Sequence, residues 1–199
     1  VVTKIPRFPF DKFTDANNSL NTQMKATGEV MAIGRTFEES LLKAVRSLET
    51  GVNHLYDKKF DTYTYDELME YIKIGTDDRL FAIAELLYHG ADINMIYDNT
   101  KIDMFFLEKI KHIVDFEEEI KANVGDLSTL REAKRMGISD KYIARLWKMK
   151  ERDVYNIRKE NKLFPVYKMI DTCASEFDSY VPYFYSTYEQ ENESIVSDK

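Results

Sequence analysis

The feature that most constrains the fold of this chain is a change of sequence pattern at Thr36. Before it the sequence has β character, because residues 1–5 alternate and a short apolar segment lies between Gly28 and Gly34. After it apolar residues recur at steps of three and four, which is the period of an amphipathic helix. The β part has too few strands to fold alone, so we expect it to need sheet neighbours.

Capping and stop signals divide the helical part into segments. Thr36-x-x-Glu39 and Thr64-x-x-Glu67 match the capping box, in which two side chains close the first turn of a helix. The sequence predicts helices that begin at Thr36, Thr64, Asp77 or Asp78, and Thr100, followed by three shorter ones over 127–136, 140–147 and 151–160. The helix from Thr100 to Gly125 carries the longest apolar stripe, and we expect it to be the core helix.

The composition is that of a globular protein with one sizeable core. The 199 residues are 44% hydrophobic, and 28 Lys and Arg against 35 Asp and Glu leave a net charge of -7, which favours solubility. One Cys rules out an internal disulfide framework and fits a reducing compartment, and no apolar run is long enough to span a bilayer. We therefore expect a soluble cytoplasmic protein with no membrane partner.

The sequence carries no common catalytic or nucleotide-binding motif. A P-loop, a dinucleotide fingerprint, a paired-His zinc helix and a nucleophile elbow are all absent. His54, His89 and His112 stand far apart with no ligand spacing, so we expect them at the surface or at helix ends rather than in a metal site. Residues 117–119 are three consecutive glutamates, which point to different sides of a helix and predict a solvated face.

One segment supports a rival interpretation. Residues 137–146 followed by 154–159 have the pattern of a helix-turn-helix whose second helix is basic. Between Arg131 and Lys162 there are eleven basic and five acidic residues, a local net charge of +6 that could neutralise phosphates. A nucleic-acid-binding module is therefore one alternative, although a short pattern in an acidic chain favours an αα-hairpin inside a helical domain. A free-standing interaction scaffold is the other alternative.

Two motif-dense blocks carry a family resemblance. TQMKATGEVMAIGR at 22–35 and PVYKMIDTCASEF at 165–177, with YSTYE at 185–189, resemble the centre of the large subunit of carbamoyl phosphate synthase. Together with residues 1–8, the first block is similar to the closing strands of the family's first ATP-grasp half. The second block resembles the lead-in to the second half, and the helical middle resembles the oligomerisation domain by its position. The resemblance implies that the chain is a fragment of that subunit.

The implied fold is mainly α: a helical oligomerisation domain with a short β-containing N-terminal remnant of an ATP-grasp domain. Residues 1–55 would be the end of the first carboxyphosphate synthetase domain, and residues 56–170 the helical oligomerisation and connection domain. Residues 171–199 would be a linker into the second, carbamoyl phosphate synthetase domain; their polar, acidic end from Glu189 fits a linker.

The implied function is that of a connecting and oligomerisation segment of a ligase. In this family the full enzyme uses two ATP, with Mg or Mn, to convert bicarbonate and glutamine-derived ammonia into carbamoyl phosphate for arginine or pyrimidine biosynthesis. The resemblance implies that Met24 and Glu29 lie on the wall of the internal passage between the two halves, where water is excluded and a few polar groups meet a carbamate.

The resemblance also limits what this chain does by itself. It implies that the nucleotide and metal ligands lie elsewhere in the enzyme, so we expect no catalytic, cofactor-binding or metal-binding residue here. The implied partners are the remaining domains of the large subunit, the glutaminase small subunit and further copies of the chain, with no nucleic acid.

Overall fold

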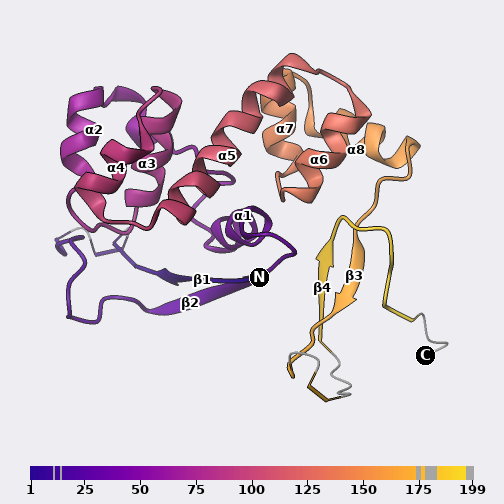
Figure 1. Cartoon of the computed structure of the whole chain (residues 1–199), viewed down its shortest axis with the longest axis horizontal. Coiled ribbons are helices and arrows are strands. Elements are labelled where there is room, and N and C mark those ends of the chain that lie inside the picture. Colours follow the sequence, from indigo (N-terminus) through magenta and orange to yellow (C-terminus); the bar gives the residue numbers. More distant parts are fainter. Residues whose placement is uncertain (11, 14, 174–175, 178–182, 196–199) are drawn as a thin grey trace.

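The computed structural model describes residues 1–10, 12–13, 15–173, 176–177 and 183–195. Within these residues the protein has eight α-helices, one 3-10 helix and two separate two-stranded antiparallel sheets (Figure 1). The fold is therefore mainly α with short β elements, as the sequence predicts. No helix in this part of the chain is both long enough and apolar enough to cross a membrane.

The first sheet is a hairpin of β1 (Val2–Arg7) and β2 (Gly28–Ile33), paired in antiparallel register from Val2 opposite Ile33. Both strands confirm the sequence prediction. Alternation along the strands gives the hairpin two unlike faces, because Ile5 is partly buried against the core whereas Met31 is exposed. Helix α1 packs against both strands of the hairpin.

Helix α1 (Phe37–Ser47) begins where the sequence predicts. The hydroxyl of Thr36 accepts a hydrogen bond from the backbone N–H of Glu39 at 3.2 Å and caps the helix. The reciprocal half of the predicted capping box is wrong, because the Glu39 carboxylate accepts from the N–H of Arg35 at 2.7 Å instead of from Thr36. The helix then buries Leu42 and Val45 completely.

A first group of helices comprises η1 (Lys58–Thr62), α2 (Tyr65–Tyr71), α3 (Arg79–Tyr88) and α4 (Ile93–Thr100). We call residues 57–102, which contain them, the α2–α4 lobe. The capping box predicted for α2 is present in full, between Thr64 and Glu67. Helix α3 follows Asp78, as the sequence predicts.

The predicted start of the long helix at Thr100 is wrong. Thr100 ends α4, where its hydroxyl donates to the carbonyl of Ile96 at 2.8 Å, and Lys101 then turns the chain with a φ of 56°. The long helix α5 (Met104–Ala122) is capped instead by Asp103, which accepts from the N–H of Phe105. The sequence analysis missed α4, because Ile96 is the only residue that this short helix buries.

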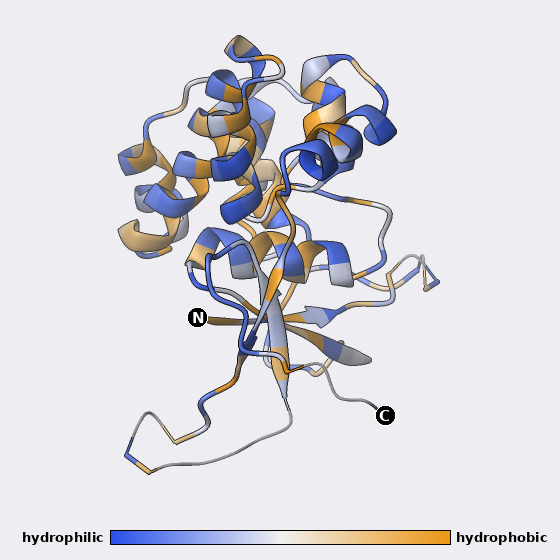
Figure 2. Ribbon diagram, turned by 90° about the vertical axis from the view of Figure 1, so that its right-hand side faces the viewer, coloured by the Kyte–Doolittle hydropathy of each residue, from blue (hydrophilic) through white to orange (hydrophobic). Residues whose placement is uncertain are grey.

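Helix α5 forms the centre of the core, as predicted. It buries Leu107, Ile113 and Ile120 completely. A second group, α6 (Leu127–Arg135), α7 (Asp140–Trp147) and α8 (Glu151–Glu160), confirms the three short helices expected. We call residues 127–162 the α6–α8 lobe; Figure 1 shows the two lobes on opposite sides of α5. Hydrophobic and hydrophilic residues alternate along the helices, as they do in amphipathic helices that share a core (Figure 2).

The second sheet is a hairpin that the sequence analysis did not predict. β3 (Val166–Met169) pairs antiparallel with β4 (Phe184–Thr187), so β structure is not confined to the first 35 residues. The segment expected to be a linker also contributes, because Glu193 accepts from the N–H of Met169 at 2.6 Å and its own N–H donates to the carbonyl of Tyr167 at 2.8 Å.

Candidate functional site

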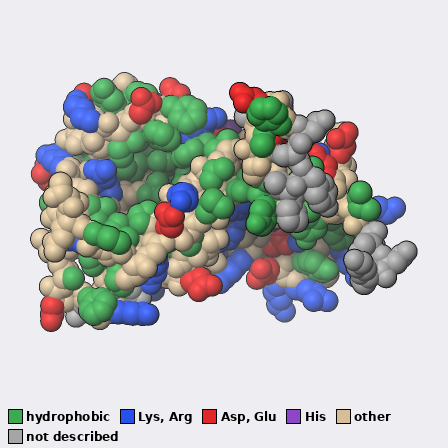
Figure 3. Space-filling view, turned by 90° about the horizontal axis from the view of Figure 1, so that it is seen from below, with side chains coloured by type: hydrophobic (Ala, Val, Ile, Leu, Met, Phe, Trp, Pro, Cys, Tyr) green, Lys and Arg blue, Asp and Glu red, His purple; other side chains and the backbone are tan. Residues whose placement is uncertain are grey.

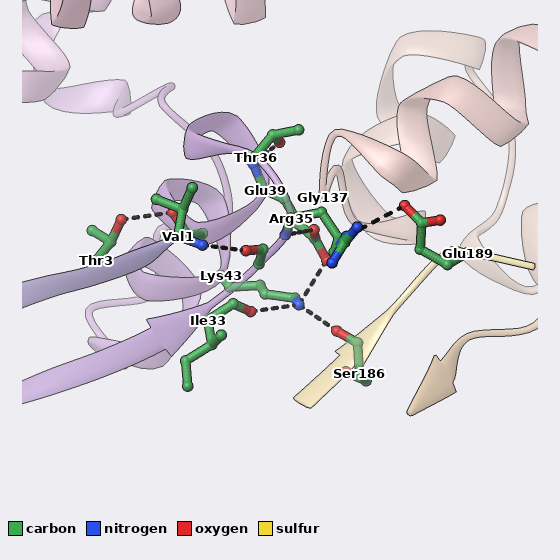
Figure 4. Close-up of polar contacts among 12 residues, drawn as sticks. Val1, Thr3, Ile33, Arg35, Thr36, Glu39, Lys43, Gly137, Ser186 and Glu189 are labelled. Atoms are coloured by element: carbon green, nitrogen blue, oxygen red, sulfur yellow. Dashed lines mark hydrogen bonds and ion pairs between the residues drawn. The ribbon is translucent and has the colours of Figure 1, made fainter. Parts of the chain in front are cut away.

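Three segments that are far apart in sequence meet along α1. They are the end of β2, the turn between α6 and α7, and β4 (Figure 4). We call the meeting point the junction and define it by six residues: Arg35, Glu39, Lys43, Gly137, Ser186 and Glu189. It is the place where both hairpins are fixed to the helical part of the chain.

Lys43 is the centre of the junction. Its ammonium group donates to the carbonyl of Ile33 at 2.9 Å and to the carbonyl of Ser186, and it lies 2.7 Å from the Glu39 carboxylate (Figure 4). Hydrogen bonds from a charged donor contribute about 1.5–3 kcal/mol each. One side chain of α1 therefore holds the end of β2 and the middle of β4 together.

Glu39 and Gly137 fix α1 against the turn between α6 and α7. A Cβ on Gly137 would lie 2.9 Å from Cα of Glu39, so only glycine allows this approach. The φ of Gly137 is 86°, in the left-handed region that also favours glycine. Arg46, one turn beyond Lys43 on the same helix, donates to the carbonyl of Gly137 at 2.6 Å.

Arg35 connects the start of α1 to the residues around β4. A hydrogen bond with Tyr185, together with the nearby charge of Glu189, raises the pKa of Arg35. The guanidinium lies 3.8 Å from the Glu189 carboxylate (Figure 4). Because Arg35 is exposed, this ion pair contributes little stability, and its main effect is on orientation.

A buried ion cluster lies beside the junction in the α6–α8 lobe. Asp140 accepts three hydrogen bonds from Arg158, two from Nε and one from Nη2, and lies 2.8 Å from the Lys134 ammonium. Burial lowers the pKa of Lys134 to about 8 in spite of that carboxylate. The ring of Tyr188, just after β4, lies within cation–π distance of both Lys134 and Arg158.

This cluster bears on the helix-turn-helix interpretation. The segment does form two helices, α7 and α8, as both interpretations expect. Arg158, on the second helix, is 8% exposed and is bound to Asp140 and to the carbonyl of Leu163. Two of the eleven basic side chains are therefore engaged inside the domain, as an internal αα-hairpin requires.

Met24 and Glu29, the expected passage residues, both belong to the first hairpin. Met24 lies in the loop between β1 and β2 and is 88% exposed. Glu29 lies on the exposed face of β2, where its carboxylate is 2.6 Å from the Lys4 ammonium. Neither residue contacts the junction in the described part of the chain, and their role in a passage stays a prediction.

Two predictions about polar residues are wrong. His54 and Glu117, expected at the surface and on a solvated face, are each 1% exposed, and His54 Nε2 lies 2.9 Å from Glu117 Oε1. Tyr88 and Tyr142 also donate to this carboxylate. The cluster joins the segment after α1 to α3, α5 and α7, and burial lowers the pKa of His54. Of the three consecutive glutamates at 117–119, Glu118 and Glu119 are exposed, as expected.

The described residues contain no group of three or more His, Cys, Asp and Glu side chains that could hold a metal ion. Sequence reasoning also missed Lys43 and Glu39 as junction residues, because a lysine and a glutamate four residues apart on a helix are typical of any exposed helical face. The sequence signals for this site were the glycine-bounded segment before α1 and Gly137, since glycine is typical of positions where two backbone segments approach closely.

Fold and junction together define a helical connecting or oligomerisation domain that holds two short hairpins at one point. A family model described as "Carbamoyl-phosphate synthetase large chain, oligomerisation domain" matches residues 29–162. The chain therefore belongs to this family, which is one of ligases, and the resemblance found in the sequence is confirmed.

Proposed function

We propose that this chain is the central segment of a carbamoyl-phosphate synthetase large chain that connects two synthetase halves and contributes to oligomerisation. The full-length protein would make carbamoyl phosphate from bicarbonate, glutamine-derived ammonia and two ATP, with Mg or Mn held outside this segment. The observation that carries the proposal is the junction, where Lys43 binds the end of β2 and the middle of β4 at once.

The two hairpins support the proposal because each is incomplete by itself. A two-stranded sheet is at best marginally stable, and each hairpin here has only two strands in the described residues. The outer face of the first hairpin exposes Val2 and Met31 by more than half. Figure 3, which views the molecule from the side of the hairpins, shows several groups of hydrophobic side chains among the charged ones. Such surfaces suit further strands and domains of the same protein.

Met24 and Glu29 are proposed to line the passage between the halves. Their exposure fits this role, because a residue on the wall of a passage between domains is accessible when one of those domains is considered alone. Lys4 beside Glu29 would keep the local charge close to neutral next to an anionic carbamate. The proposed partners are the rest of the large chain, a glutaminase small subunit and further copies, in the cytoplasm.

Complementation tests this function. The purified chain alone should hydrolyse no ATP, whereas co-expression with the two flanking synthetase segments and the glutaminase small subunit should restore glutamine-dependent synthesis of carbamoyl phosphate. The matched control is the same co-expression with Lys43→Met, which should assemble poorly and restore less activity. ATP hydrolysis by the purified chain, or full activity of the flanking segments without it, would contradict the proposal.

A further inference from the structure

The two lobes on either side of α5 carry opposite charge. The α2–α4 lobe, residues 57–102, has ten acidic and five basic residues and a net charge of -5. The α6–α8 lobe, residues 127–162, has eleven basic and five acidic residues and a net charge of +6. Since the lobes lie on opposite sides of α5, the domain is strongly dipolar in spite of its overall negative charge (Figure 1).

Most of these charges are on the surface. Among the charged residues of the α6–α8 lobe, Lys134 and Arg158 are the buried ones, and both are bound to Asp140. The exposed basic residues of this lobe are Arg131, Arg135, Lys141, Arg145, Lys148, Lys150, Arg152, Lys159 and Lys162. The exposed acidic residues of the other lobe are Asp61, Asp66, Glu67, Glu70, Asp77, Asp92 and Asp98. The opposite charges are therefore available to a partner.

Both lobes also expose apolar side chains that can anchor an interface. Ile74, Met95 and Tyr97 on the α2–α4 lobe are each more than one third exposed, and so is Tyr155 on the α6–α8 lobe. Protein interfaces combine such anchors with a charged rim that selects the partner and its orientation.

We propose that the α6–α8 lobe of one copy docks against the α2–α4 lobe of a second copy, in a two-fold pair. This rests on the oligomerisation role proposed above and names its surfaces. In a two-fold interface, residue i of one copy meets residue j of the other, and residue j of the first meets residue i of the second. The positive lobe of each copy therefore faces the negative lobe of the other. The opposite arrangement, in which like lobes meet, would bring like charges together and is disfavoured.

Charge reversal on each lobe tests the pairing. Lys141→Glu with Arg152→Glu reverses two charges of the positive lobe, and Glu70→Lys with Asp98→Lys reverses two of the negative lobe. The first pair lies in the first turns of α7 and α8, and the second pair lies toward the C-terminal ends of α2 and α4. Each new charge is therefore the one that the helix dipole favours, and the fold is preserved.

Sedimentation velocity should show that each double variant self-associates about tenfold more weakly than the wild-type chain. An equimolar mixture of the two double variants should associate more tightly than either variant alone. In the mixed pair one lobe contact keeps its wild-type charges, and in the other the new glutamates face the new lysines. Raising NaCl from 50 to 500 mM should weaken the wild-type pair about tenfold through screening. Lys12→Glu, in the loop after β1, is the control and should have no effect.

Other outcomes separate this inference from the proposed function. Association that neither double variant weakens, or a mixture no tighter than its components, overturns the lobe pairing and leaves the oligomerisation role standing. Monomers at all concentrations, in the chain and in the full-length protein, refute both. Salt-dependent binding of duplex DNA that Lys141→Glu with Arg152→Glu abolishes would assign the positive lobe to nucleic acid and overturn the pairing.

Discussion

The ammonium group of Lys43 on α1 donates to the carbonyl of Ser186 on β4, across 143 residues of sequence. The same group donates to the carbonyl of Ile33 at the end of β2, only ten residues away. A local and a very distant segment are thus joined by one side chain. This contact is the structural basis for regarding the domain as a connector.

Lys43→Met should loosen the second hairpin without unfolding the helices. The thioether keeps the apolar stem of the lysine but makes neither charged hydrogen bond, so we expect a loss of about 2–4 kcal/mol in local stability. Hydrogen exchange of residues 166–169 and 184–187 should become faster, while that of α5 should not change. Lys111→Met, on an exposed face of α5, is the matched control. Unchanged exchange in the second hairpin would show that Lys43 does not hold it.

Gly137→Ala should destabilise the whole domain. The new Cβ would meet the backbone of Glu39 at 2.9 Å, and alanine is strained at a φ of 86°. We expect a loss of about 2–3 kcal/mol in the free energy of unfolding, measured with urea. Gly125→Ala has a similar φ of 78° but open space around its Cβ, so it isolates the backbone effect and should cost about 1 kcal/mol. Equal losses in the two variants would refute the close approach.

Glu117→Ala should be one of the most damaging single substitutions in the chain. It leaves the donors of His54, Tyr88 and Tyr142 buried without their acceptor, at a cost of about 3 kcal/mol or more. Glu118→Ala changes the neighbouring exposed glutamate and should cost less than about 0.5 kcal/mol. Denaturant unfolding of the two variants measures the difference, and similar midpoints would mean that the cluster contributes nothing.

His54 should make stability depend on pH in the mildly acidic range. Because burial lowers its pKa in the folded state, the unfolded chain binds the proton more readily. Its contribution is complete above the unfolded pKa of about 6.5 and is lost as the pH falls toward the folded pKa. The melting temperature should therefore decrease between pH 7 and pH 5. His54→Gln cannot titrate and should remove most of this decrease; an identical pH profile in that variant would assign it to other groups.

Glu29→Ala in the full-length enzyme should uncouple ATP consumption from product formation. The reason is its proposed place on the wall of the passage, where a lost polar group would let the carbamate escape to water. ATP hydrolysed per carbamoyl phosphate formed is the quantity to measure. Glu118→Ala serves as the control because Glu118 is exposed on α5. An unchanged ratio in Glu29→Ala would count against the passage role.

Sequence reasoning succeeded where the signal was local. The first turn of α1, the full capping box at Thr64 and the three helices of the α6–α8 lobe all depend on residues three or four positions apart. It failed at Thr100, because a threonine that ends one helix by bonding to Ile96 has the same sequence appearance as one that begins the next.

The remaining errors share a physical cause, which is that the partners are distant in sequence. β3 and β4 are paired although a long connection separates them in sequence, and His54 contacts Glu117, which is 63 residues away. A charged or polar side chain is buried only where such a partner binds it, and this partnership produces no periodic pattern in the sequence from which burial could be predicted. The junction could not be predicted for the same reason, whereas the family could, because it rests on two long ordered blocks of sequence.

Because Lys43 binds both the end of β2 and the middle of β4 at the junction, the distance between these two strands does not depend on the number of residues that separate them in sequence. Loops in either lobe can lengthen or shorten during evolution while the two attachment points stay in place. Domains attached at these two points would therefore keep their positions relative to each other.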